Sequence, residues 1–180
     1  MAVTAAGTPY VESSDNVADY PGVSLALANH IDATAGKVLQ VVSAISTTPF
    51  TTTSSTFVDV TDVSLSITPS ATTSKVFVIV TGVAGNSDTN KLTFLNLVRD
   101  STPIAQSTGG VTNSSLAVYT NSAVGNSGFA QHIVDSPNTT SATTYKLQIK
   151  SSGGTAMVGR NASSANNPSP TIITVFEVAA

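Results

Sequence analysis

The feature that most constrains the fold of this chain is an alternation of apolar and polar side chains that recurs through most of its length. In "FVDVTDVSLSITPS", Val63, Leu65 and Ile67 alternate with Ser and Thr, and "TYKLQIK" repeats the pattern with Tyr, Leu and Ile. Because successive side chains of a β-strand point to opposite faces, this two-residue period predicts strands that each bury one face. The sequence therefore predicts a β domain over residues 37–180.

The composition agrees with an all-β fold, because charged side chains make up only 9% of the chain and Ser, Thr and Asn supply most of the polar surface. About eight to ten short strands, separated by turns, are expected. "KVFVIVTGVAG" predicts a central strand buried on both faces, and "IITVFEV" predicts a closing strand inside the fold. This pattern is typical of a jelly-roll-like antiparallel β-sandwich.

Residues 1–36 differ from the rest and predict an N-terminal arm with one short helix. Asp19 can cap this helix, Pro21 fits its first turn, and Gly36 can end it. A helix of about 13 residues is marginal on its own in water, so it must pack against something. It packs either on its own sandwich or, as an attachment and oligomerisation arm, on another subunit or a larger assembly. Its apolar face consists of Val23, Ala26, Leu27, His30 and Ile31.

The predicted arm is acidic, since the charged side chains before Lys37 are Glu12, Asp15, Asp19 and Asp32, whereas the remainder of the chain is close to balanced. An acidic arm predicts a basic docking surface on a partner, although Asp19 could equally complement the helix dipole. The net charge of −3 argues against nucleic acid as a partner, because phosphate binding needs clustered Lys and Arg. The residues predicted to form the arm interface are Glu12, Asp15, Val23, Leu27, His30 and Ile31.

The sequence shows no recognisable catalytic or metal-binding motif. It has no cysteine, and its two histidines, His30 and His132, are too few for a multi-histidine metal site and are interpreted as structural. The segment "NSDTN", residues 86–90, spaces oxygen side chains as a calcium loop does, but it lacks the glycine and glutamate of such a loop and is interpreted as a solvated hairpin tip. We therefore expect no enzyme activity, no cofactor and no metal.

No targeting or membrane segment is evident. The first residues lack the basic stretch and apolar run of a secretory signal, and no apolar run approaches the roughly 18 residues of a membrane helix. We expect a soluble protein, with no membrane partner, that is synthesised in a cytoplasm without a signal peptide.

Part of the chain resembles the small β-sandwich virion proteins of tailed bacteriophages. The run "GKVLQVVSAISTTPFTTTSSTFVDVTDVSLSITPSATTSKVFVIVTG", then "LNLVRDSTPIAQS" and "TIITVFEV", carries the resemblance through a Gly-Lys start, a Ser/Thr connector, a "TPS…SK" turn and an "L-x-RD" strand. The leading "YVESSDNVADYPGVSLALANHID" is similar to segments that precede such domains in phage fibre-type proteins. The resemblance implies a structural protein on the outer surface of a virion, often a homotrimer, made in the host cytoplasm.

Two functions fit this resemblance. In the first, a homotrimeric capsid decoration (cement) protein docks through its arm on the major capsid protein or another virion protein and stabilises the shell. In the second, a short head or tail fibre, or a receptor-binding tip, contacts a host surface glycan through loops such as "NSDTN", "STGGVTNSS" or "NASSANNPSPT". The lack of Trp and the presence of only four Tyr favour the first, because sugar-binding sites usually present aromatic faces. A bacterial lectin or adhesin domain would fit the fold but would normally carry a secretion signal.

Overall fold

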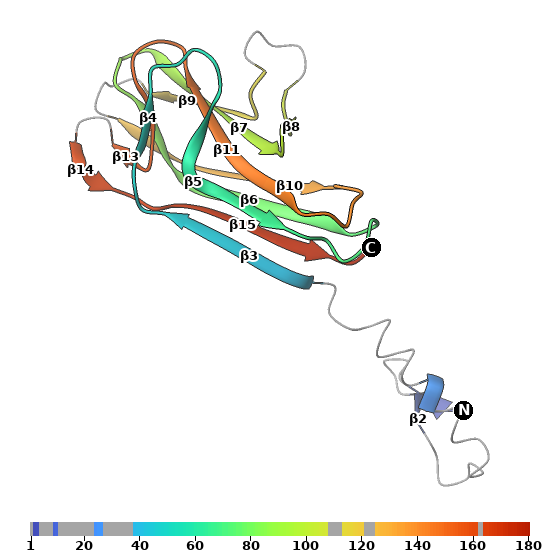
Figure 1. Cartoon of the computed structure of the whole chain (residues 1–180). Helices are drawn as coiled ribbons and strands as arrows, with labels where there is room; N and C mark the ends of the chain where they lie inside the picture. Colours follow the sequence, from blue (N-terminus) through green and yellow to red (C-terminus); the bar gives the residue numbers. More distant parts are fainter. Residues whose placement is uncertain are drawn as a thin grey trace. The chain divides into compact units, whose positions relative to one another are not determined.

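The structure is a computed structural model, and it describes residues 2–3, 9–10, 24–26, 38–107, 113–120, 125–161 and 164–180 (Figure 1). The chain divides into two compact units, Met1–Lys37 and Val38–Ala180. No helix among the described residues is long and apolar enough to cross a membrane.

In the first unit, β1 (Ala2–Val3) pairs antiparallel with β2 (Pro9–Tyr10), a pairing that the sequence pattern did not predict. Residues 24–26 are helical, in agreement with the predicted helix over the part of it that the structure describes. The predicted arm interface lies outside the described residues at all six of its positions, which are Glu12, Asp15, Val23, Leu27, His30 and Ile31.

The second unit consists of β-strands, and every strand pairing described in it is antiparallel. Eight principal strands build its two sheets, and five short strands extend them or form a small separate pair. The principal strands are β3 (Val38–Ser46), β5 (Val58–Ile67), β6 (Lys75–Asn86), β7 (Lys91–Arg99), β9 (Leu116–Thr120), β10 (Asn126–Asp135), β11 (Thr143–Ser151) and β15 (Thr171–Val178). The short strands are β4 (Phe50–Thr52), β8 (Thr102–Ile104), β12 (Ala156–Val158), β13 (Arg160–Asn161) and β14 (Ser164–Pro168).

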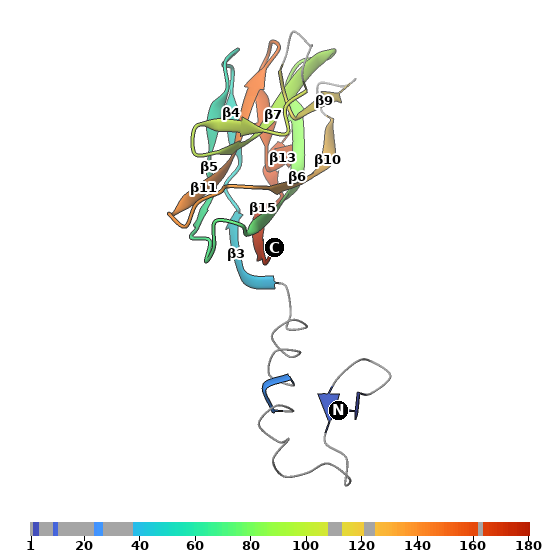
Figure 2. The ribbon, with the colours of Figure 1, turned by 90° about the vertical axis from the view of Figure 1, so that its right-hand side faces the viewer.

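The order of the strands is that of a jelly roll. One sheet, here called sheet I, has the order β3-β15-β6-β10, and the other, sheet II, has the order β5-β11-β7-β9. Along the chain, the first principal strand pairs with the eighth, the second with the seventh, the third with the sixth and the fourth with the fifth. Winding a long hairpin into two sheets gives this nested pattern. The predicted jelly-roll-like sandwich is confirmed, and Figure 2 shows the two layers.

The hydrophobic core lies between the two sheets. The inward positions that the alternation predicts in β5 and β11 are confirmed, because their side chains are at most 8% exposed. Sheet II contributes Val63, Leu65, Ile67, Leu95, Leu97, Tyr145, Leu147 and Ile149 to the core, and sheet I contributes Val76, Val78, Val80, Ile173 and Val175. The closing strand β15 runs between β3 and β6, so its predicted place inside the fold is also confirmed.

One prediction about β6 is right and another is wrong. The strand is central, between β15 and β10, but it is not buried on both faces. Val76, Val78 and Val80 are fully buried against sheet II, whereas Phe77 and Ile79 on the opposite side are only partly buried. No layer of the second unit covers that side within the described residues, although most of its side chains are apolar.

The hairpin interpretation of "NSDTN" is also wrong. Residues 87–90 connect β6 of sheet I to β7 of sheet II, so they cross between layers and do not close a β-hairpin. The segment is nonetheless solvated at Asp88, Thr89 and Asn90. A hairpin does form further along the chain, at Asp100, because Arg99 pairs with Thr102 and Asp100 has a φ of 53°.

Candidate assembly surface

The outward side of sheet I carries large apolar side chains that are exposed to solvent, among them Val41, Ile45 and Val134. The strand registers place its side chains in three rows across β3, β15, β6 and β10. The rows are Val41–Phe176–Phe77–Val134, Ser43–Thr174–Ile79–His132 and Ile45–Ile172–Thr81–Ala130. We call these twelve residues the sheet I face. Eight of them are apolar, four are Ser, Thr or His, and none is Asp, Glu, Lys or Arg.

The side chains of the sheet I face are open to solvent where neighbouring strands do not shield them. Val41 is 54% exposed, Ile45 is 61% exposed and Val134 is 60% exposed, which are high values for branched apolar side chains. These three lie on the lateral strands β3 and β10, whereas residues on the two central strands are partly buried by their flanks. The exposed apolar surface therefore extends across all four strands.

Aromatic rings lie within the sheet I face. The ring of Phe77 lies 6.1 Å from that of Phe176, and it meets His132 edge-on at 6.0 Å between ring centres. Such pairs stabilise the surface of a sheet. His132, interpreted from the sequence as a structural histidine, is thus packed on Phe77 but exposed to solvent.

The polar side chains in the middle row are partly satisfied within the face. The hydroxyl groups of Ser43 and Thr174 are hydrogen-bonded at 2.9 Å, and Ser43 Oγ also reaches the carbonyl oxygen of Ile173 at 3.3 Å. Removing water from a hydroxyl group costs less free energy when that group already has a hydrogen-bond partner within the protein. Burying this row against another surface therefore costs less desolvation free energy than its polar composition suggests.

The outward side of sheet II has the opposite character. Lys146 and Asp59 form an ion pair at 2.8 Å, and Gln148 donates a hydrogen bond to the same carboxylate at 2.7 Å. The hydroxyl groups of Ser66 and Thr144 are hydrogen-bonded at 2.8 Å. Charged and hydroxyl side chains thus cover this side, as expected of a surface that remains in water.

Two buried polar clusters stabilise the sandwich away from the sheet I face, and the first joins the two sheets. Asp135 of sheet I accepts hydrogen bonds from Arg99 Nη1 at 2.8 Å and from the Tyr145 hydroxyl at 2.7 Å, both from sheet II. Burial, followed by the hydrogen bond to the Asp135 carboxylate, raises the pKa of Tyr145 well above its ordinary range. The hydrogen bond to Asp135 raises the pKa of Arg99. The cluster is a structural link between the sheets.

The second cluster surrounds Glu177, whose side chain is fully buried at the end of β15. Its carboxylate accepts hydrogen bonds from the Ser70 amide at 2.7 Å, from the Ser70 hydroxyl at 2.6 Å and from Gln40 Nε2 at 2.6 Å. Burial by itself raises the pKa of Glu177, but the hydrogen bonds from Ser70, Gln40 and Ser74 together outweigh it and lower the pKa to about 2. The charge therefore holds the turn between β5 and β6 against β3 and β15.

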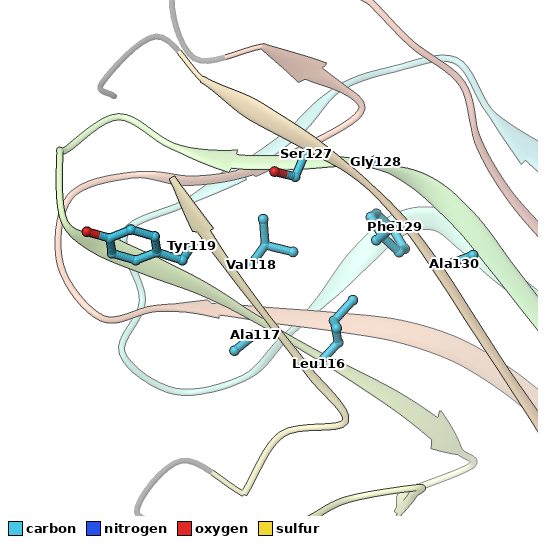
Figure 3. A pocket seen from close by; sticks show the side chains of 8 residues that line it. All are labelled: Leu116, Ala117, Val118, Tyr119, Ser127, Gly128, Phe129 and Ala130. Carbon is cyan, nitrogen blue, oxygen red and sulfur yellow. The ribbon is translucent and has the colours of Figure 1, made fainter. Parts of the chain in front are cut away.

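A hollow of about 350 Å³ lies between β9 and β10, where the two sheets end side by side (Figure 3). Residues 116–119 line one side and residues 127–130 the other. Tyr119 at its rim is 52% exposed, and its hydroxyl donates a hydrogen bond to Asn90 Oδ1 at 2.5 Å. Asn90 belongs to the "NSDTN" segment, so an aromatic ring and a polar loop meet at this hollow.

Within "NSDTN", side-chain oxygen atoms of Asn86 and Asp88 accept hydrogen bonds from the turn itself. Asn86 Oδ1 accepts a hydrogen bond from the Asp88 amide at 3.1 Å, and Asp88 Oδ1 accepts one from the Ser87 hydroxyl at 2.8 Å. Asn86 Nδ2 donates to Ser151 Oγ at 3.1 Å. Over the described residues, no three His, Asp or Glu side chains are grouped so that they could hold a metal ion.

No family model matches this chain, and no curated protein matches it either.

The sequence pattern did not single out the sheet I face, although it contained the signal. The runs "VLQVV", "KVFVIV" and "IITVF" are apolar at both odd and even positions, although burial on both sides was predicted only for the strand that contains "KVFVIV". Within one copy of the second unit only the inner side is buried. The outer side therefore carries core-like residues that the second unit does not itself cover.

Proposed function

We propose that the protein is a structural subunit of a bacteriophage virion, a homotrimeric capsid decoration protein that docks on the shell through residues 1–36 and stabilises it. The observation that carries the proposal is the uncharged, apolar sheet I face on a jelly-roll body. Jelly rolls are among the folds from which viral capsid proteins are built. An exposed apolar sheet surface is typical of a subunit that functions within an assembly. The sequence resemblance to phage virion proteins supports the same function.

In this function the protein acts through binding free energy alone. The acidic residues Glu12 and Asp15 would face a basic surface of the major capsid protein or another virion protein, and the apolar stripe of Val23, Leu27 and Ile31 would bury itself there or against a neighbouring copy. Three arms on one trimer bind as a linked set, so a weak single contact becomes a strong attachment. Each contact formed on the shell opposes the internal pressure of the packaged genome.

Mass spectrometry of purified virions with copy-number estimation tests the proposal. Decoration predicts hundreds of copies per particle, whereas absence of the protein from the virion contradicts a virion function altogether. In a second test, Leu27→Asp should weaken trimer formation or binding to the particle while the sandwich stays folded. Ser24→Asp is the matched control, because Ser24 belongs to the same predicted helix, lies outside its predicted apolar face and is exposed. Equal capsid occupancy and equal sedimentation for the two variants would exclude the helix face as an interface.

A second function, that of a fibre or receptor-binding tip, is favoured by one feature. The exposed ring of Tyr119 beside the hollow and the adjacent Asn90 provide an aromatic face and an amide group, the two elements that a sugar-binding site combines. In that case a few dozen copies or fewer are expected per virion, and Tyr119→Ala should abolish binding to host cells. Binding that Tyr119→Ala leaves unchanged would exclude this site.

A further inference from the structure

We propose that the sheet I face is the contact surface between copies of this chain, so that in the assembled trimer each copy turns β3, β15, β6 and β10 toward its neighbours. This inference rests on the proposed homo-oligomeric structural function and adds the surface that would form the oligomer. The occupant is a second copy of the same chain. The inference follows from the lack of charge on the face and the position of its most exposed residues.

The size of the face sets how much of an oligomer interface it can supply. Its three rows, about 6.8 Å apart, cross four strands spaced about 4.8 Å apart, so the face covers a flat area of about 400 Å². If three copies bury it around one axis, each of the three pairwise contacts buries about 400 Å², below the roughly 1,200–2,000 Å² of specific, stable interfaces. The face therefore forms part of each contact, and residues 1–36 would have to contribute the rest.

The lack of charge favours a copy of this chain over a charged partner. The twelve residues of the face include no Asp, Glu, Lys or Arg, so its centre has no group that a basic or acidic surface would recognise, and the Lys146–Asp59 pair lies on the other sheet. Lys75, two residues before Phe77 on the same side of β6, lies just beyond the last row. Interface centres are depleted of charge and enriched in aromatic residues, as at Phe77 and Phe176. Two copies can therefore approach through this face without repulsion between like charges.

The exposed residues are arranged to fit a rotational assembly. In a ring of identical copies, one lateral edge of the face meets the opposite lateral edge of the next copy. Val41 and Ile45 on β3, and Val134 on β10, are the apolar side chains with the greatest exposure on the face. Since both edges are apolar, the β3 edge of one copy matches the β10 edge of its neighbour.

A charge placed in the centre of the face tests the inference. Thr174→Lys introduces an ammonium group between Ser43 and Ile79 at a position that is already polar and partly exposed, so folding should tolerate it. Thr144→Lys is the matched control, because Thr144 occupies a comparable place on sheet II and is hydrogen-bonded to Ser66 as Thr174 is to Ser43. Full-length proteins are compared by sedimentation velocity over a range of concentrations, and thermal melting confirms that each is folded.

The parent protein and Thr144→Lys should form the same oligomer, and Thr174→Lys should associate at least tenfold more weakly. A monomeric parent protein at all concentrations, or a Thr174→Lys oligomer as tight as that of the parent, would overturn the inference. If Thr174→Lys does not fold, Val134→Glu takes its place, because that side chain is 60% exposed and contributes little to the core. The same weakening is then expected.

The absence of native cysteine allows a test that does not disrupt the surface. Thiol labelling of Thr174→Cys should slow several-fold as the protein concentration rises, while labelling of Thr144→Cys should not change. Equal labelling at all concentrations overturns the inference. Slow labelling of Thr174→Cys in a monomer also overturns it, since the chain itself would then cover the face. A protein that is present in virions and forms an oligomer that Thr174→Lys does not weaken would retain the proposed function and lose only the proposed interface.

Discussion

The buried carboxylate of Glu177 permits a quantitative test of how the sandwich is stabilised. Glu177→Gln keeps one carbonyl oxygen, which can still accept the two hydrogen bonds from Ser70, but its amide nitrogen then faces Gln40 Nε2, which is itself a donor. Gln40 cannot simply rotate its amide, because the same nitrogen donates to the Thr68 carbonyl oxygen at 2.7 Å. One hydrogen bond to a charged group is lost and two donors are left facing each other.

Hydrogen bonds to charged groups contribute about 1.5–3 kcal/mol each, and a buried donor without a partner adds to the loss. We therefore expect Glu177→Gln to lower the free energy of unfolding by about 2–4 kcal/mol at neutral pH, and the melting temperature by roughly 5–15 °C. Urea unfolding followed by far-ultraviolet circular dichroism, at a fixed protein concentration, measures the change. Asp59→Asn is the control, because its partly exposed ion pair with Lys146 contributes at most about 1 kcal/mol.

The direction of the pKa shift of Glu177 predicts how the free energy of unfolding depends on pH. The pKa of Glu177 falls from its ordinary value of 4.5 to about 2 in the folded protein, so its stabilisation is complete well above pH 4.5 and is lost as the pH falls through about 2. The difference in the free energy of unfolding between the parent protein and Glu177→Gln should therefore become smaller as the pH is lowered from neutral to 2. A difference that stays constant over this range, or one no larger than that for Asp59→Asn, would refute a stabilising buried carboxylate.

Three further outcomes are expected. Tyr145→Phe removes one donor from the buried Asp135 and should cost about 1–2 kcal/mol, and in the parent protein Tyr145 should not ionise in an alkaline absorbance titration until the fold is lost. Gly154→Ala should destabilise the fold by about 2 kcal/mol or more, because Gly154 has a φ of 66° and a Cβ there would lie 2.5 Å from a side-chain atom. Gly128→Ala, whose Cβ would approach nothing closer than 4.0 Å, should stay within about 1 kcal/mol of the parent protein, and equal effects would contradict the steric explanation. Deletion of residues 171–180 removes a strand from inside sheet I and should abolish soluble expression, so a soluble truncation that melts cooperatively would contradict the position of β15.

Local periodicity predicted the strands and their inner faces. Leu65 and Leu147 could be assigned to the core because a strand exposes alternate residues to opposite sides, and this rule needs no knowledge of neighbouring strands. The closing strand could be placed inside the fold for a similar reason, since "IITVFEV" is too apolar for an exposed edge. The tight turn at Asp100 was also predictable, because its signal is local.

The errors arose where a pattern has two structural outcomes. Turn residues at "NSDTN" predict a change of direction, but the same residues serve a hairpin within one sheet and a crossing between two sheets. The apolar residues of "KVFVIV" predict burial on both sides, but a single sequence does not say whether the cover is part of the same chain. Phe77 and Ile79 were therefore expected in a core and instead form part of the sheet I face.

The amino-acid sequence by itself determined that the chain is all-β, which side of most strands faces the core, and that its few charges are spread thinly over a Ser/Thr-rich surface. Only the tertiary structure decided which strands are neighbours, and thereby that apolar residues from β3, β15, β6 and β10 merge into one continuous uncharged surface. The physical reason is that side-chain alternation is a property of a single strand, whereas a sheet surface is assembled from strands far apart in the chain. Their order is set by the packing of the whole core.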